Sequence, residues 1–307
     1  MGIVERMVEL IRETSSSLPE DVERVLKRQL AREKRAQNAA AALNLSTILD
    51  NVALARKQGT PLCQDTGTLT FFVDESLRRK VTPAVLKQAV AIATEKGYLR
   101  RNTIDSVSGR SYDDNVAEGA PVVHYVVGSG NSGCSGNPSG SRGRVTLLMK
   151  GGGSENMSRQ YSLPDEALGA GRDLEGVRKC VLDAVQKIQG YGCAPGILGV
   201  SIGGDRATGY EVAKEQLLRP LDEDFLSSGA GECLSDGQLK TSKPQKLKHL
   251  EKRLLREANG LGIGPMGLGG KTTLLGVKVA ARTRVPASFF VTVAYMCWAC
   301  RRRSIRI

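Results

Sequence analysis

The sequence predicts a mixed α+β fold, with a helical amino-terminal part followed by a mixed β-sheet with flanking helices. Apolar residues recur at helical spacing through the first 60 residues. After them, strand-like apolar runs and helical patterns follow one another without a strict strand–helix alternation and without an internal repeat. A chain of 307 residues can bury a sizeable core. We expect one domain, residues 1–307, with a subdivision near residue 60.

Three helices are predicted in the helical part. The third is the alanine-rich segment 36–59, which ends near Gly59. The second opens at Pro19, because proline is favoured at the start of a helix. The apolar stripes of the first two helices consist of Ile3, Val4, Met7, Val8 and Ile11, and of Val22, Val25, Leu26 and Leu30.

The remainder of the chain is predicted to contain both strands and helices. The run "TLTFFVD" predicts a strand, and the helix after it has Thr82 as N-cap, Pro83 at its first position and Gly97 just past its end. Further strands are expected at 121–127, 144–150, 196–203, 273–280 and 287–296, and helices at about 174–189, 205–218 and 245–259. Two Gly/Ser-rich stretches, 128–143 and 227–243, are predicted surface excursions.

The composition is that of a globular protein, with 40% apolar and 25% charged residues. No run approaches the roughly 18 apolar residues of a membrane span, and the amino terminus lacks a signal-peptide core, so we expect a cytoplasmic location. The net charge of +12 suggests a nucleic-acid-binding protein, but only 4% of residues are aromatic and no RNP, zinc-finger or helix-turn-helix pattern appears. The charge also fits a solvated surface with a docking edge at "RRRSIR", or attraction of a dianionic small substrate.

The stretch "GIGPMGLGGKTTLLG", residues 262–276, resembles a phosphate-binding P-loop but does not match its spacing. A P-loop has its first glycine five residues before the Gly-Lys-Thr, and Pro265 stands there. Proline has no N–H to offer a phosphate. The stretch also follows a predicted helix, whereas a P-loop follows a buried strand. Nucleotide hydrolysis is therefore disfavoured.

Seven cysteines, an odd number in a long chain without an export signal, argue against a disulfide framework. Cys63, Cys193 and Cys297 each stand at a junction between a Gly/Pro-rich or polar turn and a strand-like run. Cys180 lies on a helix face and is predicted to be a core residue. The others are Cys134 and Cys233 in the excursions, and Cys300, which forms a CxxC with Cys297.

Three interpretations of the junction cysteines remain open at this point. Three distant thiolates at glycine-rich turns suit an iron–sulfur cluster with one open iron, which can act as a Lewis acid. The CxxC of Cys297 and Cys300 suits a redox pair or half of a zinc site. In the third interpretation, the three cysteines are buried and serve only as packing residues.

Five segments, taken together, favour the cluster. They are "PLCQDTG", "KGGGSEN", "CAPGILGVSIGG", "GIGPMGLGGKTTLLGVKV" and "AYMCWACRR". In this order they resemble the alpha subunit, or amino-terminal cluster-binding region, of class I fumarate hydratases, a family that includes the L-tartrate dehydratases. The resemblance extends from about residue 20 to the end. It implies that the "GPMGLGGKTT" segment is a structural, site-lining loop.

The resemblance implies a set of site residues. Cys63, Cys193 and Cys297 would be the ligands of a [4Fe–4S] cluster with an open fourth iron. Gln64 and Asp65 would contact the substrate beside that iron, with Asp65 in a catalytic role. Arg100 would pair with a substrate carboxylate, with its neighbour Arg101 as the competing assignment. Within Gly151–Gly153, a site-lining run, Gly152 would present a main-chain N–H to a carboxylate.

The sequence departs from the family at one position, and the resemblance implies a partner. Family members often carry a substrate-facing His in a His-Pro pair before the last cysteine strand, where this chain has Val285. Valine cannot donate a hydrogen bond or titrate, which puts substrate preference or rate in question. In the family the catalytic base belongs to a separate beta domain or subunit, so we expect a hetero-oligomer with a beta subunit.

The function expected from these features is a hydro-lyase that hydrates fumarate reversibly to L-malate at a [4Fe–4S] cluster. A dehydratase of L-tartrate or another 2-hydroxy diacid is the close alternative. A basic nucleic-acid-binding protein is the alternative from a different class, although we expect neither nucleic acid nor membrane as a partner.

Overall fold

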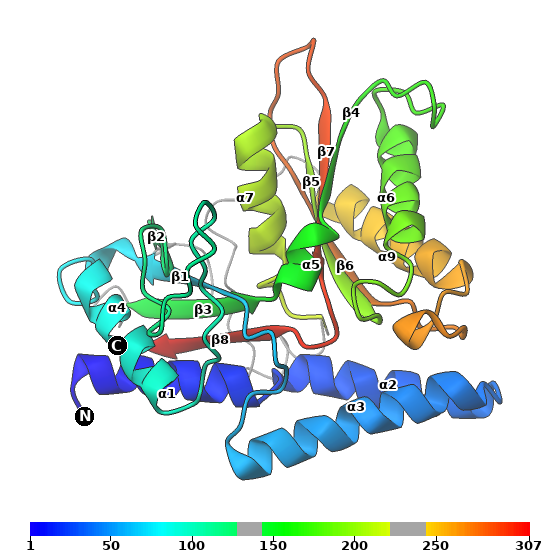
Figure 1. Cartoon of the computed structure of the whole chain (residues 1–307). Helices are drawn as coiled ribbons and strands as arrows, with labels where there is room; N and C mark the ends of the chain where they lie inside the picture. Colours follow the sequence, from blue (N-terminus) through cyan, green and yellow to red (C-terminus); the bar gives the residue numbers. More distant parts are fainter. Residues whose placement is uncertain (128–142, 222–243) are drawn as a thin grey trace, which may run out of the picture. The chain divides into compact units, whose positions relative to one another are not determined.

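The computed structural model describes residues 1–127, 143–221 and 244–307. The chain forms two compact units, each built from separate stretches (Figure 1). Unit 1 consists of Met1–Pro19, Asp50–Gly152 and Ala299–Ile307, and unit 2 of Glu20–Leu49 and Gly153–Trp298. Each unit contains helices and a four-stranded sheet, which confirms the α+β class. The single domain subdivided near residue 60 stays a prediction. The two predicted excursions lie outside the described residues, apart from Gly143.

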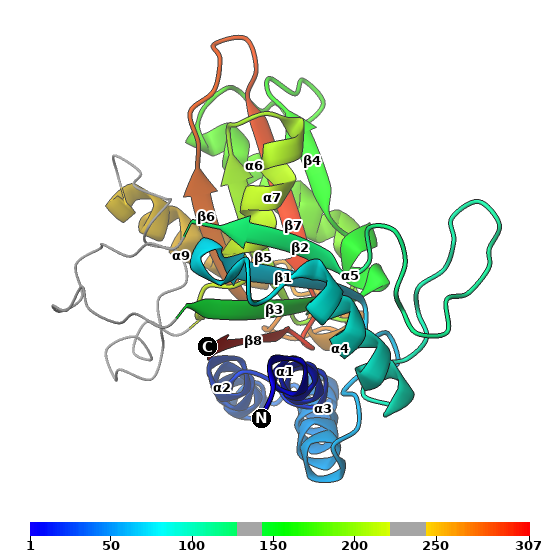
Figure 2. The same ribbon diagram turned by 90° about the vertical axis from the view of Figure 1, so that its left-hand side faces the viewer.

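Unit 1 contains the sheet β2–β1–β3–β8, whose strands follow one another in this order in Figure 2. β1 pairs in parallel with β2 and antiparallel with β3, and β3 pairs antiparallel with β8. Helices α1 and α4 pack against each other, and α1 also packs on β3 and β8. Their shared core includes Leu10, Phe71, Val90 and Leu147, all fully buried. The bounds are α1 Ile3–Ser16, β1 Thr68–Asp74, η1 Glu75–Leu77, α4 Pro83–Glu95, β2 Val122–Val126, β3 Arg144–Lys150 and β8 Arg301–Arg306.

The local signals around α4 are confirmed. The Thr82 hydroxyl accepts a hydrogen bond from the Val85 N–H (3.3 Å), and Pro83 occupies the first helical position. Gly97, just past the helix end, has a φ of +74°, a conformation that glycine adopts without steric cost. The start and end of this helix are therefore set by the sequence.

Strand β8 was not predicted, because its four arginines obscure the apolar alternation of a strand. The strand packs beside α1, where Arg303 makes an ion pair with Glu13 (3.2 Å) and Ile305 packs against the core. The "RRRSIR" segment is thus an edge strand paired with β3. The four-residue strand β4 of unit 2 was missed as well.

Unit 2 contains the sheet β4–β7–β5–β6. β5 pairs in parallel with β6 and antiparallel with β7, and β7 pairs antiparallel with β4. Helix α7 covers one face of this sheet, and α6 and α9 cover the other (Figure 1). The bounds are α2 Glu20–Arg35, α5 Gly152–Asn156, β4 Arg159–Ser162, α6 Leu174–Ile188, β5 Gly196–Ile202, α7 Arg206–Gln216, α9 Pro244–Gly260, η2 Pro265–Gly267, β6 Leu274–Ala281 and β7 Phe290–Met296. Helix α3, Ala39–Gln58, begins in unit 2 and ends in unit 1.

The predicted helices and strands outside the masked stretches are present within a few residues of their expected bounds. In the part of the chain that the structure describes, none of the helices is long and apolar enough to cross a membrane.

Candidate functional site

Two of the three predicted ligands, Cys193 and Cys297, meet at one end of the sheet in unit 2. Cys193 lies three residues before β5, and Cys297 directly follows β7. β5 and β7 are antiparallel, with Ile197 opposite Met296, so the start of one strand lies beside the end of the other. The Trp298 N–H donates to the carbonyl oxygen of Cys193 (3.5 Å), which ties the two segments together.

Two serines, Ser154 in the "KGGGSEN" segment and Ser158 just after it, hold the end of β7. The buried Ser154 hydroxyl accepts a hydrogen bond from the Cys297 N–H (3.1 Å), and the Ser158 hydroxyl accepts one from the Tyr295 N–H (3.3 Å). These contacts fix the backbone on either side of Met296. The serines, which the sequence analysis did not single out, therefore position Cys297.

Tyr295 occupies a slot beside Cys193 that two glycines leave open. A Cβ on Gly192 would lie 2.4 Å from the ring, and a Cβ on Gly196 would lie 2.5 Å from the hydroxyl oxygen. The Tyr295 hydroxyl is buried and has no hydrogen-bond partner among the described residues. Burial raises the pKa of Tyr295 far above its usual range, and the neighbouring thiols of Cys297 and Cys193 raise it further.

The cysteines that the structure describes differ in accessibility, which separates candidate ligands from packing residues. Cys193 is exposed, and Cys63 and Cys297 are half-buried, whereas Cys180 and Cys300 are completely buried. Burial raises the pKa of Cys180 to about 12, so its thiolate, the form that binds metals, is strongly disfavoured. Cys180 packs in the core of unit 2, as predicted.

Cys63 belongs to unit 1, so its meeting with Cys193 and Cys297 stays a prediction. The described residues contain no group of three or more His, Cys, Asp and Glu side chains that could by themselves hold a metal ion. The accessible thiol pair and its glycine-lined surroundings fit part of the ligand set of an iron–sulfur cluster.

That loop packs tightly onto the end of β3 in unit 1. Gly67 has a φ of +75°, and a Cβ there would lie 2.4 Å from the carbonyl group of Lys150. The Asp65 carboxylate lies against the backbone of Gly151, where a Cβ would be 2.7 Å from Oδ2, and a Cβ on Gly152 would be 3.7 Å away. The two motifs, far apart in the sequence, are therefore in direct contact.

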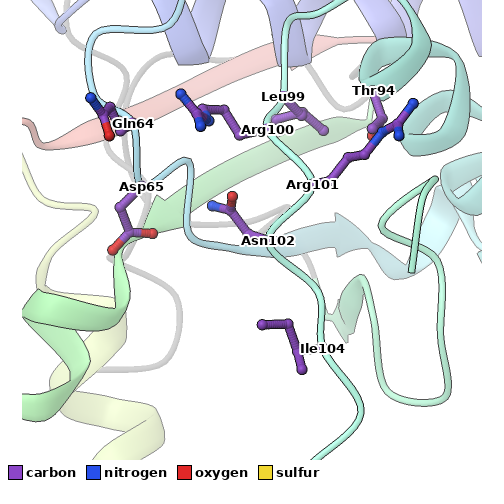
Figure 3. A pocket seen from close by; sticks show the side chains of 8 residues that line it. All are labelled: Gln64, Asp65, Thr94, Leu99, Arg100, Arg101, Asn102 and Ile104. Carbon is purple, nitrogen blue, oxygen red and sulfur yellow. The ribbon is translucent and has the colours of Figure 1, made fainter. Parts of the chain in front are cut away.

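Gln64, Asp65 and Arg100 line one open pocket of about 650 Å³ in unit 1. Figure 3 shows the Arg100 side chain directed toward Gln64, while Arg101 points the other way, toward Thr94. Arg101 makes an exposed ion pair with Asp113 (3.4 Å). This difference favours Arg100 over Arg101 as the arginine that faces Gln64 and Asp65. The full lining is Gln64, Asp65, Thr94, Leu99, Arg100, Arg101, Asn102 and Ile104.

The buried Asn115 holds the Arg100 segment in place. Its side-chain NH₂ donates to the carbonyl of Arg100 (2.7 Å) and to the hydroxyl of Thr94 (3.0 Å). Its side-chain oxygen accepts from the N–H groups of Asn102 (2.8 Å) and Thr103 (3.0 Å). Asn115 has a φ of +59°, a region where asparagine is one of the few tolerated residues. The sequence analysis missed it, although Asp-Asn within a polar turn signals such a conformation.

Thr66 and Asn102 connect the Arg100 segment to the "PLCQDTG" loop. The Thr66 hydroxyl accepts a hydrogen bond from the Arg100 N–H (3.3 Å). With its amide oriented to satisfy both groups, the Asn102 side-chain oxygen accepts from the N–H groups of Thr66 (3.0 Å) and Gly67 (3.3 Å). Asp65 and Arg100 are thus carried by two loops that bond directly to each other.

The glycine-rich stretch 262–276 of unit 2 is hydrogen-bonded to a carboxylate of the same unit. The Lys271 N–H (2.8 Å) and the Thr272 hydroxyl (2.6 Å) both donate to Oε1 of the fully buried Glu33. In a P-loop the corresponding groups face phosphate and its metal ion. A Cβ at Gly264 would lie 1.7 Å from the carbonyl oxygen of Gly269, so the glycines serve a tight fold of the loop. The stretch also follows helix α9, as predicted.

Val285 lies in the connection between β6 and β7 and is 64% exposed. Cys297 follows the opposite end of β7, and the seven residues of this strand span roughly 23 Å. Within unit 2, position 285 is therefore remote from the cysteine pair.

The chain was also compared with known proteins. The family model described as "Fumarate hydratase (Fumerase)" matches residues 4–306. A Geobacillus stearothermophilus protein named "Putative fumarate hydratase class I" is 43% identical over 310 residues, covering 99% of this chain and 55% of the relative. The chain thus spans about half the length of that relative.

Two further relatives are named as alpha subunits. The Methanocaldococcus jannaschii protein "Putative L(+)-tartrate dehydratase subunit alpha" is 30% identical, over 100% of this chain and 98% of its own length. The L(+)-tartrate dehydratase subunit alpha of Escherichia coli K12 is 29% identical, over 95% of this chain and 86% of its own length. With a family match across nearly every residue, the chain belongs to the fumarate hydratase family of hydro-lyases.

Proposed function

We propose that this chain is the cluster-binding alpha part of a hydro-lyase that interconverts fumarate and L-malate. The observation that carries the proposal is the pocket of unit 1, which Gln64, Asp65 and Arg100 line together. Cys63 directly precedes Gln64 in the chain. An amide, a carboxylate and a guanidinium can together bind a hydroxy dicarboxylate. The family match and the alpha-subunit names of the relatives agree with this assignment.

Cys63, Cys193 and Cys297 would hold a [4Fe–4S] cluster. When bound, the cluster supplies a Lewis acid through the iron that lacks a protein ligand, and this metal centre can polarise a substrate hydroxyl group. Cys193 and Cys297, whose thiols are accessible and whose segments lie side by side at one end of the sheet in unit 2, support this ligand set.

The residues of this chain would bind and orient the substrate. Arg100 would pair with one carboxylate through two parallel hydrogen bonds, a geometry that fixes both position and orientation. Gln64 would donate its amide N–H to a substrate oxygen. Asp65, held against Gly151, would accept a hydrogen bond from the substrate hydroxyl, and the main-chain N–H of Gly152 would donate to a carboxylate.

The proton removed from carbon would be taken by a base outside this chain. We expect that base on a beta subunit, because relatives of nearly equal length are named as alpha subunits. The active enzyme would be a hetero-oligomer, and its location would be cytoplasmic.

L-tartrate dehydration is the second candidate, supported by the names of the two relatives near 30% identity. Fumarate is favoured because the relative named for it is 43% identical. Activity assays of the complete enzyme with L-malate and with L-tartrate separate the two. A kcat/KM higher for L-tartrate than for L-malate would reverse the assignment.

The cluster is tested by anaerobic reconstitution of the chain with iron and sulfide. We expect a broad visible absorbance near 400 nm and about four irons per chain. Cys63→Ser, Cys193→Ser and Cys297→Ser should each lower the iron content, whereas the buried Cys180→Ala should leave it unchanged. Full iron content in all three serine variants would contradict the ligand assignment.

A further inference from the structure

The Tyr295 hydroxyl is a buried hydrogen-bond donor. The side chain is about 1% exposed, and its oxygen has no hydrogen-bond partner among the described residues. Leaving such a group unpaired is unfavourable relative to a bonded one. Phenylalanine would fill the same space without this cost. The presence of the hydroxyl therefore indicates an acceptor that the described protein groups around it do not provide.

The position of this hydroxyl relates it to both cysteines of unit 2. Tyr295 lies two residues before Cys297, and both side chains pack against the same hydrophobic cluster of unit 2. On the β5 side, the ring fits between Gly192 and Gly196, and its oxygen would be only 2.5 Å from a Cβ at 196. Gly192 directly precedes Cys193. The hydroxyl is therefore held between the segments that carry the two thiols.

The backbone around this donor is tightly fixed. The Ser158 hydroxyl accepts from the Tyr295 N–H, and the Ser154 hydroxyl accepts from the Cys297 N–H. Cys193 itself has a φ of +53°, a left-handed conformation that carries a steric cost for a residue other than glycine. Such a cost at an exposed thiol beside a buried, unpaired hydroxyl indicates geometry shaped for a bound group.

We propose that the Tyr295 hydroxyl donates a hydrogen bond to a sulfur atom of the cluster bound by Cys193 and Cys297. This inference rests on the proposed cluster and adds a residue that tunes it without ligating iron. Hydrogen bonds to cluster sulfurs are among the factors that set reduction potential. A donor at this position stabilises the more negative, reduced cluster and shields its sulfur from oxidants.

The test compares Tyr295→Phe with the wild-type chain and with Tyr161→Phe. Tyr161, on β4 of the same unit, donates its hydroxyl hydrogen bond to Asp183 Oδ2 (2.7 Å), and it pairs with Val291, near the far end of β7 from Cys297. Both substitutions remove one buried or half-buried hydroxyl. Only Tyr295→Phe removes the donor beside the cysteines.

Three readouts are measured on the reconstituted full chain: iron content, reduction potential and the rate at which the absorbance near 400 nm decays in air. For Tyr295→Phe we expect about four irons, a more negative potential and a severalfold faster decay. Tyr161→Phe should match the wild-type chain in all three. Before reconstitution, Tyr295→Phe should have an unchanged or higher Tm, because no hydrogen bond is lost, whereas Tyr161→Phe should have a lower one.

The outcomes separate this inference from the proposed function. A wild-type chain that assembles no cluster would overturn both. A wild-type cluster with four irons, together with a Tyr295→Phe cluster of identical potential and identical decay, would overturn the role of Tyr295 alone.

Discussion

The carboxylate of Asp65 lies so close to the backbone of Gly151 that a Cβ there would come within 2.7 Å of Oδ2. This contact joins the "PLCQDTG" loop to the "KGGGSEN" segment, two motifs that are 86 residues apart at these positions. It also ranks the three glycines of the run. Gly151 cannot accept a side chain without moving Asp65. A Cβ at Gly152 would lie at an ordinary van der Waals distance from the Asp65 carboxylate, and a Cβ at Gly153 would meet nothing within 4 Å.

The first prediction follows from this ranking. Gly151→Ala should displace Asp65, destabilise the chain by about 1–3 kcal/mol through overpacking, and lower kcat/KM of the complete enzyme at least about tenfold. Gly153→Ala is the matched control and should behave like the wild type. Urea denaturation and steady-state assays give the two quantities. An active, fully stable Gly151→Ala variant would show that the position of Asp65 is unimportant.

The second prediction separates Arg100 from Arg101. Arg100→Ala should raise KM for L-malate about 10–100-fold, because a charge-assisted hydrogen bond contributes about 1.5–3 kcal/mol. Arg101→Ala should change KM less than about twofold, since Arg101 points away from Gln64 and its exposed pair with Asp113 contributes little. If the two variants exchanged these effects, Arg101 would be the substrate-binding residue.

The third prediction concerns Asn115. Asn115→Ala removes four hydrogen bonds and places alanine at a φ of +59°, so we expect a loss of about 2–4 kcal/mol in the free energy of unfolding. Asn115→Gly removes the same bonds but tolerates the backbone, and should lose less. Asn44→Ala, which loses one exposed hydrogen bond on α3, should stay within about 0.5 kcal/mol of the wild type. Chemical denaturation of all three variants provides the measurement.

A related readout ties Asn115 to the site. Because Asn115 fixes the backbone of residues 100–103, both of its variants should raise KM for L-malate through displacement of Arg100. An unaltered KM in a destabilised variant would restrict Asn115 to a structural role.

The fourth prediction tests the glycine-rich stretch. Glu33→Ala should destabilise the chain by about 3–5 kcal/mol, because the Lys271 N–H and the Thr272 hydroxyl lose a buried carboxylate partner. Lys271→Ala, which removes an exposed side chain, should change neither stability nor activity. Equilibrium dialysis should detect no ATP bound to the wild type. ATP binding that Lys271→Ala abolished would restore the P-loop interpretation.

Local chemistry explains why many elements could be predicted. The cap of α4 depends on Thr82, Pro83 and Gly97, all within a few residues of the helix ends, and the apolar runs of β1, β5 and β7 are continuous in the sequence. β8 was missed because its arginine-rich sequence does not resemble a strand. It forms a strand through pairing with β3, which lies more than 150 residues earlier in the chain. Strand formation there is a tertiary effect.

The sequence by itself determined the α+β class, the family motifs and the residue types available for chemistry: three junction cysteines, an Asp and an Arg. Only the tertiary structure decided which of them meet. Antiparallel pairing of β5 and β7 brings Cys193 to Cys297, and the bonds among Thr66, Asn102 and Asn115 aim Arg100 rather than Arg101 at Gln64. The physical reason is that motif identity is a local property of the chain. Side-chain direction and convergence depend instead on strand register and on hydrogen bonds between residues distant in sequence.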